Sequence, residues 1–268
     1  MLVRLFFFVI GLSAAFQEAI WRWWYQRLAT TYPKEDWKFM NYGYVPLQDQ
    51  ASLPLKNEDE KNRTFIQLYH HVLSGIDMKG KDVLEVGSGR GGGADYVART
   101  FAPASLIGVD LSKNAVDLSN QFFKEPNLKF MEGNAEKLPF ENERFDVVFN
   151  VESSHCYPNM DAFVKEVTRV LKPGGIFAWA DLRTAKSMDE VECLFKKSPL
   201  KLISQEDITR NVSQALEQIS SWKKEEIHKK VPFLWRHFFS EFAGVKNSQT
   251  YRALKNGTMV YRCYRFQK

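Results

Sequence analysis

Five glycines within residues 83–93, VLEVGSGRGGG, constrain the fold of this chain more than any other feature. The apolar residues before the glycines have the pattern of a buried strand, and the residues after them favour a helix. Gly87 and Gly89 permit a tight turn and a close approach of the backbone to a ligand. The free N–H groups at the start of the next helix add further donors. The segment therefore predicts a strand, a ligand-binding loop and a helix in succession.

Two acidic residues near this loop bear on the ligand. The glycine spacing alone also fits a dinucleotide-binding loop, and Asp110 stands where an acid binds the ribose hydroxyls of either a dinucleotide or S-adenosylmethionine (SAM). Glu85, two residues before the first glycine, would repel a pyrophosphate but attract the ammonium and sulfonium groups of SAM. Glu85 therefore favours SAM as the ligand.

Short apolar runs and helical stretches alternate beyond residue 80. We expect strands over 82–86, 105–109, 128–131, 145–150, 176–180 and 257–266, and helices over 64–73, 92–101, 113–123 and 160–171. Such alternation is typical of βαβ units, in which helices cover both faces of a parallel sheet. Residues 185–242 have the pattern of amphipathic helices without strands. We expect them to form a helical cap inserted near the end of the sheet.

The composition excludes several classes of protein. The 268 residues are 44% hydrophobic and 26% charged, which is too apolar for a disordered chain. The net charge is only +5, and no run of five or six like charges occurs, so no nucleic-acid partner is indicated. The three cysteines are odd in number and far apart, unlike a disulfide framework or a metal knuckle. His70 and His71 are adjacent and point to different helix faces, so we expect no metal site.

Three sequence blocks follow the glycine loop in a fixed order: 133–140 (GNAEKLPF), 145–158 (FDVVFNVESSHCYP) and 171–175 (LKPGG). Together with the loop they resemble class I SAM-dependent methyltransferases. The resemblance implies an α/β fold with a doubly wound, mostly parallel seven-stranded sheet of the Rossmann-like methyltransferase type. Further segments resemble the phthiotriolone and phenolphthiotriolone dimycocerosate O-methyltransferases over nearly the whole chain from Trp21: 20–25 (IWRWWY), 39–44 (FMNYGY) and 180–183 (ADLR).

The resemblance implies SAM as the cofactor and a set of residues that bind it. In order along the chain they are Glu85, Gly87, Ser88 and Gly89 for the methionine and ribose, Asp110 and Leu111 for the ribose and adenine, Asn134, Ala135 and Glu136 for the adenine, and Asn150 beside the methionine. The family usually has Asp at the position of Asn134, but an amide can both donate to and accept from adenine. Glu136 is equally well explained as a solvated loop charge.

Methyl transfer from SAM is an in-line displacement, so the enzyme mainly aligns the reactants and excludes water. For a hydroxyl acceptor, His155 is the candidate catalytic base, because it follows the fourth expected strand and neutral imidazole accepts a proton at physiological pH. The alternative is a histidine that only packs against the cofactor. We expect Cys156 to be a small buried residue, since the reaction needs no covalent enzyme intermediate.

The acceptor pocket is expected between the 39–44 segment and the cap, with Tyr42, Tyr44 and Glu152 as substrate-binding residues. Both covers are rich in aromatic residues: Trp37, Phe39, Tyr42, Tyr44, Trp222, Phe233, Trp235, Phe238 and Phe239. Aromatic walls favour a large apolar acceptor, so we expect methyl transfer to a hydroxyl of a lipid or polyketide-like molecule. The alternatives are C-methylation of a sterol, isoprenoid or quinone, and a SAM-fold protein that binds without catalysis.

Residues 5–16, LFFFVIGLSAAF, form an uncharged apolar run that is shorter than the ~20 residues of a spanning helix. An uncleaved membrane-attaching segment, a cleaved signal peptide and a helix packed on the domain each fit this run. Because SAM is supplied in the cytosol, we expect membrane association at a cytoplasmic face, for example of the endoplasmic reticulum, rather than a secreted or lumenal protein.

The expected units are 1–20 (hydrophobic segment), 21–80 (N-terminal helices and substrate cover), 81–184 (SAM-binding core), 185–242 (cap) and 243–268 (C-terminal strands). The oligomeric state is not predicted.

Overall fold

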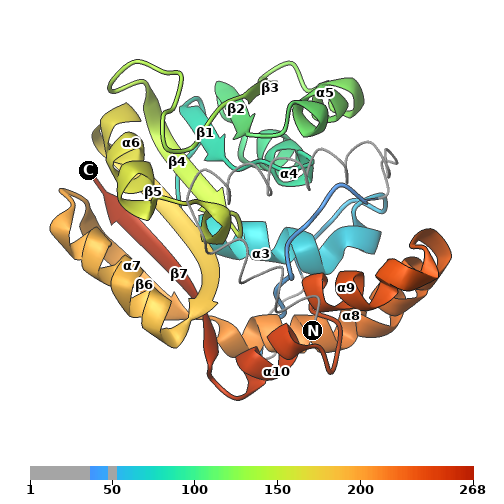
Figure 1. Cartoon of the computed structure of the whole chain (residues 1–268). Coiled ribbons are helices and arrows are strands. Elements are labelled where there is room, and N and C mark those ends of the chain that lie inside the picture. Colours follow the sequence, from blue (N-terminus) through green and yellow to red (C-terminus); the bar gives the residue numbers. More distant parts are fainter. Residues whose placement is uncertain (1–36, 48–52) are drawn as a thin grey trace.

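The computed structural model describes residues 37–47 and 53–268 of the chain (Figure 1). The predictions for the hydrophobic segment and for the 20–25 block lie outside these residues. Within them, no helix is both long enough and apolar enough to cross a membrane.

Seven strands form one sheet with the order β3-β2-β1-β4-β5-β7-β6. Their bounds are β1 (Asp82–Val86), β2 (Ser105–Asp110), β3 (Leu128–Glu132), β4 (Phe145–Val151), β5 (Leu171–Thr184), β6 (Lys201–Asp207) and β7 (Met259–Gln267). The first five strands pair in parallel, and β7 runs antiparallel to both β5 and β6. The predicted fold class, an α/β fold with a mostly parallel seven-stranded sheet, is confirmed.

Helices cover both faces of the sheet (Figure 1). Their bounds are α3 (Arg63–Leu73), α4 (Gly92–Phe101), α5 (Lys113–Phe122), α6 (Met160–Val170), α7 (Ala185–Lys197), α8 (Thr209–Lys230), α9 (Phe233–Phe242) and α10 (Gln249–Lys255), with 3-10 turns η2 (Glu60–Asn62) and η3 (Ser154–Cys156). One apolar core lies under α3 and α4, where Leu68 and Val97 are fully buried. A second core joins α6 and α7 to the opposite face through Phe163, Phe195 and Trp179. Burial of these side chains stabilises the doubly wound arrangement.

The prediction that residues 185–242 contain no strand is wrong, because β6 (Lys201–Asp207) lies within them. This strand is an edge strand with every residue exposed, so its sequence lacks the alternating apolar pattern of a half-buried strand. Its hydrogen bonds to β7, which is distant in sequence, hold it in place. Residues 243–268 supply the helix α10 and the single strand β7 rather than several strands. Helices α8, α9 and α10 pack on one another below the sheet in Figure 1, and we call them the cap.

The segment 38–44 crosses the sheet edge at which the parallel strands end. Its backbone is fixed at three places: Gly92 N donates to Lys38 O at 3.2 Å, Tyr42 N to Glu152 Oε2 at 2.9 Å, and Tyr44 N to Thr64 O at 2.9 Å. These bonds place the segment between the glycine loop and the cap, as we expected of a cover over the site. Ligands of open α/β sheets bind at this carboxyl edge.

Candidate active site

Two cavities meet at this edge of the sheet. The cofactor cavity is lined by the glycine loop, the end of β2, residues 133–136 and the residues after β4, including Tyr69, Gly87, Ser88, Gly89, Asp110, Leu111, Asn134, Ala135, Glu136, Glu152, Ser153, Cys156 and Tyr157. The acceptor cavity lies between the 38–44 segment and the cap, and its lining includes Trp37, Tyr42, Phe65, Trp222, Lys223, Glu226, Lys230 and Phe239. Phe39, Met40, Asn41 and Arg90 line both cavities, so the two cavities adjoin at these residues.

The glycine loop has the backbone that its sequence requires. Gly87 and Gly89 have φ angles of 76° and 53°, in the left-handed region that favours glycine. A Cβ atom on Gly87 would clash with the Oγ of Ser153 and lie 2.6 Å from the hydroxyl of Tyr157. The backbone N–H groups of Gly87 and Ser88 donate to Val109 O at 2.7 Å and 3.0 Å. The loop is therefore fixed in a form that leaves room for a ligand above it.

Asp110, at the end of β2, faces the cofactor cavity and also holds the loop. Its Oδ2 accepts the N–H of Gly89 at 2.8 Å, and its Oδ1 accepts the N–H of Ser112 at 2.9 Å. Burial raises the pKa of Asp110 to about 6, although these backbone bonds lower it. Each carboxylate oxygen can accept a second hydrogen bond, so ribose hydroxyls can bind to the same group.

Glu85 and Asn150 lie behind the loop and are fully buried, and neither is among the residues that line the cavity. Asn150 Nδ2 donates to Val86 O at 2.8 Å and to Ser153 Oγ at 2.7 Å, which fastens the end of β4 to the loop. Glu85 Oε1 accepts the hydroxyl of Tyr69 at 2.9 Å, and burial raises the pKa of Glu85 to about 8. The structure therefore places both residues as supports of the loop.

The adenine-side residues of the sequence analysis all line the cofactor cavity: Leu111, Asn134, Ala135 and Glu136. Asn134 Oδ1 accepts the N–H of Glu136 at 2.8 Å, so the side chain at the unusual position shapes the turn. Glu136 Oε1 accepts the N–H of Asn159 at 2.6 Å. Glu136 therefore connects this turn to the start of α6, a role that the interpretation as a solvated charge does not include.

The residues around the cofactor cavity fit SAM. Three buried polar atoms near the loop have no hydrogen-bond partner: Glu85 Oε2, Ser88 Oγ and Asn150 Oδ1. Buried polar groups are normally satisfied, so such atoms beside a cavity indicate a polar ligand. The carboxyl group of Asp110 lines the cavity and suits hydroxyl donors such as those of the ribose of SAM.

His155 and Asp181 form a hydrogen-bonded pair next to this cavity. Asp181 is fully buried on β5, where its Oδ1 lies 2.8 Å from His155 Nδ1 and its Oδ2 accepts the hydroxyl of Ser154 at 2.6 Å. Burial alone would raise the pKa of Asp181, but His155 and Arg183 keep that pKa below its ordinary value. Burial alone would lower the pKa of His155, but Cys156 and Asp181 raise that pKa well above its ordinary value.

The raised pKa favours the protonated form of His155, whereas the sequence analysis assumed a neutral imidazole. The His155 side chain is 29% exposed, and it is not among the residues lining either cavity, although Glu152 and Cys156 on each side of it are. Cys156 is buried, as predicted. In the described ranges, no group of three or more metal-ligating side chains gathers.

A polar cluster at the junction of the two cavities combines one predicted residue, Glu152, with two that the sequence analysis missed. Glu152 has a φ angle of 50°, and its Oε2 accepts the N–H of Tyr42 at 2.9 Å and the hydroxyl of Tyr261 at 3.0 Å. Burial raises the pKa of Glu152 to about 7. The ammonium of Lys223 lies 5.3 Å from the centre of the Tyr42 ring.

Lys223 and Tyr261 come from α8 and β7, far from the glycine loop in sequence. One signal for Lys223 was available, because it lies four residues from both Ile219 and Ile227 and so interrupts the apolar stripe of its helix. A charged residue in such a stripe indicates a polar site inside the fold. Tyr261 has no comparable signal, since tyrosine is common in strands.

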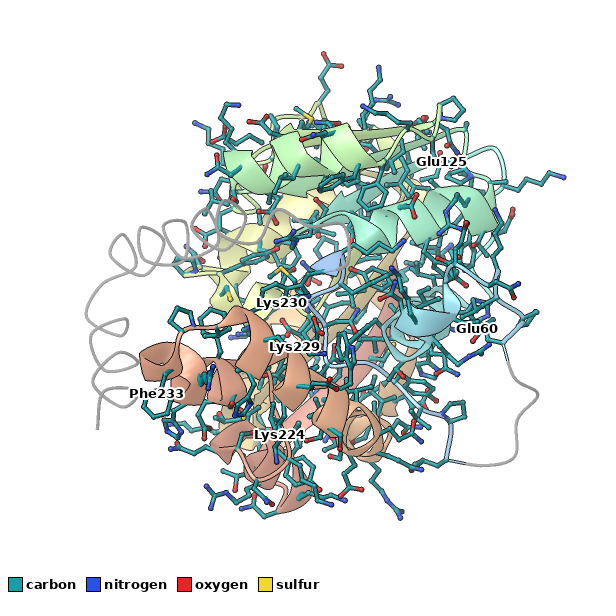
Figure 2. The ribbon with its side chains drawn as sticks, turned by 90° about the vertical axis from the view of Figure 1, so that its right-hand side faces the viewer. Glu60, Glu125, Lys224, Lys229, Lys230 and Phe233 are labelled. Atoms are coloured by element: carbon teal, nitrogen blue, oxygen red, sulfur yellow. The ribbon has the colours of Figure 1, made fainter. Side chains whose placement is uncertain are left out.

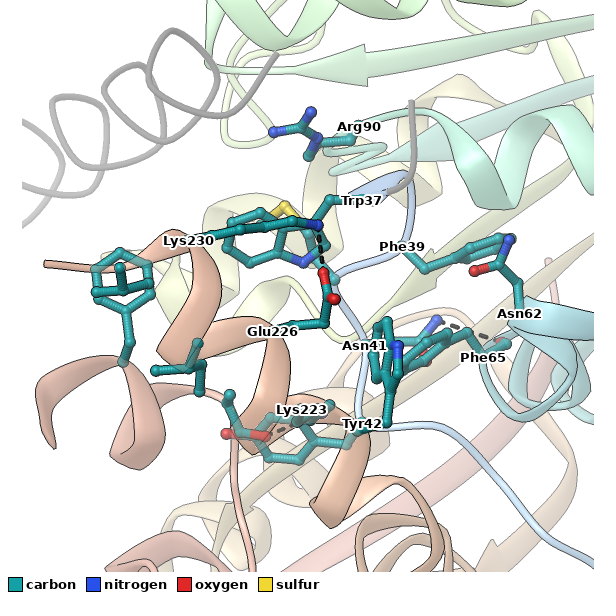
Figure 3. A pocket seen from close by; sticks show the side chains of 16 residues that line it. Trp37, Phe39, Asn41, Tyr42, Asn62, Phe65, Arg90, Lys223, Glu226 and Lys230 are labelled. Carbon is teal, nitrogen blue, oxygen red and sulfur yellow. Dashed lines mark hydrogen bonds and ion pairs between the residues drawn. The ribbon is translucent and has the colours of Figure 1, made fainter. Parts of the chain in front are cut away.

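Five of the nine aromatic residues assigned to the substrate covers line the acceptor cavity: Trp37, Phe39, Tyr42, Trp222 and Phe239 (Figure 3). Tyr44 lies outside both cavities, and its ring stacks on His71 with centroids 4.2 Å apart, so its assignment as substrate-binding is not supported. Phe233 points to solvent and is 80% exposed. The predictions for Trp235 and Phe238 concern side chains outside the described set.

Comparisons with known proteins agree with this site. Residues 84–179 match the model of the methyltransferase domain family. The chain is 39% identical to the phthiotriol/phenolphthiotriol dimycocerosates methyltransferase of Mycobacterium leprae, over 96% of this chain and 94% of that protein. It is 38% identical to the fatty-acid O-methyltransferase of Mycolicibacterium smegmatis, over 94% of this chain and 89% of that protein.

Solved structures show the same fold at low sequence identity. The geranyl diphosphate C-methyltransferase of Streptomyces coelicolor, solved with S-adenosyl-L-homocysteine, superposes with a TM-score of 0.65 and 16% identity, over 91% of this chain and 98% of that chain. The family resemblance proposed from the motifs and the cofactor SAM are both confirmed. The chain belongs to the family of SAM-dependent methyltransferases that includes the phthiotriol/phenolphthiotriol dimycocerosates methyltransferases.

Proposed function

We propose that this methyltransferase transfers the methyl group of SAM to a hydroxyl oxygen of a lipophilic acceptor. The observation that carries the proposal is the acceptor cavity, which has aromatic walls and shares the strip Phe39–Met40–Asn41 with the cofactor cavity. An apolar chain gains by leaving water for such walls. Names of relatives support an oxygen acceptor on a lipid, since one is named as a fatty-acid O-methyltransferase and another for phthiotriol dimycocerosates.

The residues at the junction align the acceptor and exclude water. SAM supplies a methyl group that its sulfonium has already activated, so positioning dominates the contribution of the protein. Glu152 fixes the 38–44 segment through Tyr42 N, and this segment separates the acceptor from the loop that holds the cofactor. The strip therefore sets the distance between the two reactants.

His155 remains the catalytic candidate in this proposal, in a changed role. Its bond to Asp181 favours the imidazolium, whose positive charge lowers the pKa of the acceptor hydroxyl, and the carboxylate of Glu152 accepts the hydroxyl proton as the new O–CH3 bond forms. We expect His155→Gln to lower kcat roughly a hundredfold, a typical loss for one electrostatic group. The Kd for SAM is expected to stay unchanged, because His155 does not line the cofactor cavity.

Incubation of the protein with isotope-labelled SAM and a total lipid extract tests the proposal. We expect label in an apolar molecule that gains the mass of one methylene group, and inhibition by S-adenosylhomocysteine. Label only in polar metabolites, from a protein that binds SAM, would contradict a lipophilic acceptor.

We also propose that the enzyme works on a membrane surface, with the α8–α9 turn as a contact in addition to residues 5–16. Phe233, 80% exposed, stands at the start of α9, four residues after the exposed Lys229 in the sequence, and Figure 2 labels both. Lys230 and Val231, which belong to the same turn, line the acceptor cavity. An exposed aromatic ring with neighbouring lysines suits an anionic lipid surface. A lipid could therefore pass from the membrane to the cavity at this turn.

A further inference from the structure

The acceptor cavity has basic residues along walls that are otherwise mostly apolar. Arg90 and Lys223 lie at opposite ends of the cavity in Figure 3, with the ion pair of Lys230 and Glu226 between them. Glu226 is the only carboxylate among the described lining residues, and it is engaged with Lys230. An acceptor that consists of a hydrocarbon chain and one alcohol group would not need these charged side chains. Burying charged side chains is costly.

Lys223 lies beside Tyr42 in the lining of the acceptor cavity. Its Nζ donates to Ala243 O at 2.9 Å and lies 5.3 Å and 5.7 Å from the ring centres of Tyr42 and Phe65. The backbone of Tyr42 is bonded to Glu152, which lines the cofactor cavity. Tyr42 and Glu152 therefore connect the surroundings of Lys223 to the cofactor cavity.

Among the described residues that line the acceptor cavity, basic side chains outnumber acidic ones. Arg90, Lys223 and Lys230 line the acceptor cavity, whereas Glu226 is the one carboxylate among its described lining residues and is paired with Lys230. The carboxyl group of Glu152 neutralises the charge of Lys223 only in part, because burial raises the pKa of Glu152 to about 7. Burial also lowers the pKa of Lys223 to about 8. A site with excess positive charge and little water is stabilised by an anionic ligand.

We infer that the acceptor is a long-chain carboxylic acid, bound as its carboxylate with Lys223 as the contact of the charged end. The inference rests on the proposed O-methyl transfer and specifies that the acceptor hydroxyl is that of a carboxyl group, which is bound in its ionised form. One carboxylate oxygen forms the new O–CH3 bond with its own electron pair, while the S–CH3 bond of the cofactor breaks and leaves its pair on sulfur. No proton leaves the acceptor, so the reaction needs no base.

The product also fits this charge arrangement. A methyl ester is neutral, and the cofactor becomes a neutral thioether at its sulfur. The cationic site therefore attracts the substrate but not the product. Loss of the acceptor's charge on methylation weakens its contact with Lys223, which favours release of the ester.

Chain-matched acceptors test the inference with the full-length enzyme: hexadecanoic acid and 1-hexadecanol, each dispersed in a neutral detergent with methyl-labelled SAM. Alkaline hydrolysis distinguishes the products, because it releases the label from a methyl ester but not from a methyl ether. We expect labelled ester from the acid and little ether from the alcohol. Ether formation at a rate equal to or above that of ester formation overturns the carboxylate inference and leaves O-methylation standing. Transfer to neither acceptor overturns the inference and also counts against the proposed function.

Substitution of Lys223 provides a second test of the inference. Lys223→Met should raise the KM for hexadecanoic acid roughly ten- to hundredfold, as expected for a lost hydrogen bond to a charged group. The KM for SAM should stay the same, which also shows that the variant is folded. Lys223→Arg should restore most of the affinity for the acid. Lys224→Met removes the same charge from the next, exposed position of α8 and should leave both constants unchanged. Equal KM values for the acid in Lys223→Met and the wild type would overturn the inference.

Discussion

Nδ1 of His155 lies 2.8 Å from Oδ1 of Asp181, and the backbone N–H of His155 also donates to Oδ2 of the same carboxylate at 2.7 Å. Asp181 thus binds both the ring and the main chain of His155, which lies in the turn η3 after β4. Because the carboxylate is fully buried, its hydrogen bonds to His155 and Ser154 replace those that water would make. The pair therefore orients the imidazole and favours its protonated form.

Asp181→Asn should lower the pKa of His155 toward its ordinary value, because a neutral amide no longer stabilises the imidazolium. The raised pKa of wild-type His155 contributes stability that is fully present below the unfolded pKa of about 6.5 and is lost as the pH rises through the folded pKa. NMR titration of His155 and denaturation at several pH values measure both effects. Asp161→Asn, which removes an exposed ion pair with Lys165, is the control. An unchanged His155 pKa in Asp181→Asn would contradict this account.

Gly87→Ala should abolish measurable SAM binding. The added Cβ would clash with Ser153 and Tyr157 in a backbone conformation that already disfavours side chains. Gly80→Ala is a matched control, since Gly80 also has a positive φ of 69° but open space around its Cβ position. The control should cost about 1–2 kcal/mol of stability from the left-handed backbone alone and should bind SAM normally. Calorimetric titration with SAM measures the affinity of both variants. Equal SAM affinities of Gly87→Ala and Gly80→Ala would show that the loop tolerates the clash.

Asp110→Ala should weaken SAM binding by about 1.5–3 kcal/mol, the usual value of hydrogen bonds to a charged group. Part of this loss comes from the loop, because Gly89 N–H loses its acceptor at the same time. Asp110→Asn retains one acceptor oxygen and should bind more tightly than Asp110→Ala. Isothermal titration calorimetry with SAM measures both, and a wild-type Kd in Asp110→Ala would remove Asp110 from the cofactor site.

Phe233→Asp should reduce binding to vesicles that contain anionic lipid, because it replaces an exposed ring with a charge that the surface repels. Activity toward a detergent-dispersed acceptor should not change, since Phe233 does not line the acceptor cavity. Leu202→Asp changes an exposed residue on β6, 55% accessible, and should leave vesicle binding as in the wild type. If both variants sediment with vesicles like the wild type, the α8–α9 turn is not a membrane contact.

The sequence predicted the core of the fold closely, because the core has strong local patterns. Strand β1 and helix α4, which flank the glycine loop, have the expected bounds. Strand β6 was missed, since an edge strand with both faces exposed has no apolar pattern and depends on pairing with β7. Its stability is a tertiary effect that a local pattern does not contain.

In the candidate site too, residues within local motifs were predicted, whereas properties that depend on tertiary contacts were not. Residues carried by motifs, such as Asp110 and Asn134, line the cofactor cavity as expected. The protonation state of His155 could not be predicted, because it depends on Asp181 from another strand. Tyr44 shares a motif with Tyr42 but lies outside both cavities and stacks on His71. Local spacing alone did not distinguish these two tyrosines.

Transfer of a carbon-13-labelled methyl group from SAM, followed by NMR of the lipid product, tests the central claim most directly. The chemical shift of the labelled carbon shows whether it is bound to oxygen or to carbon. We predict a label bound to oxygen in an acceptor with a long apolar chain. A label bound to carbon in such an acceptor would contradict O-methylation and would favour the alternative of a C-methyltransferase.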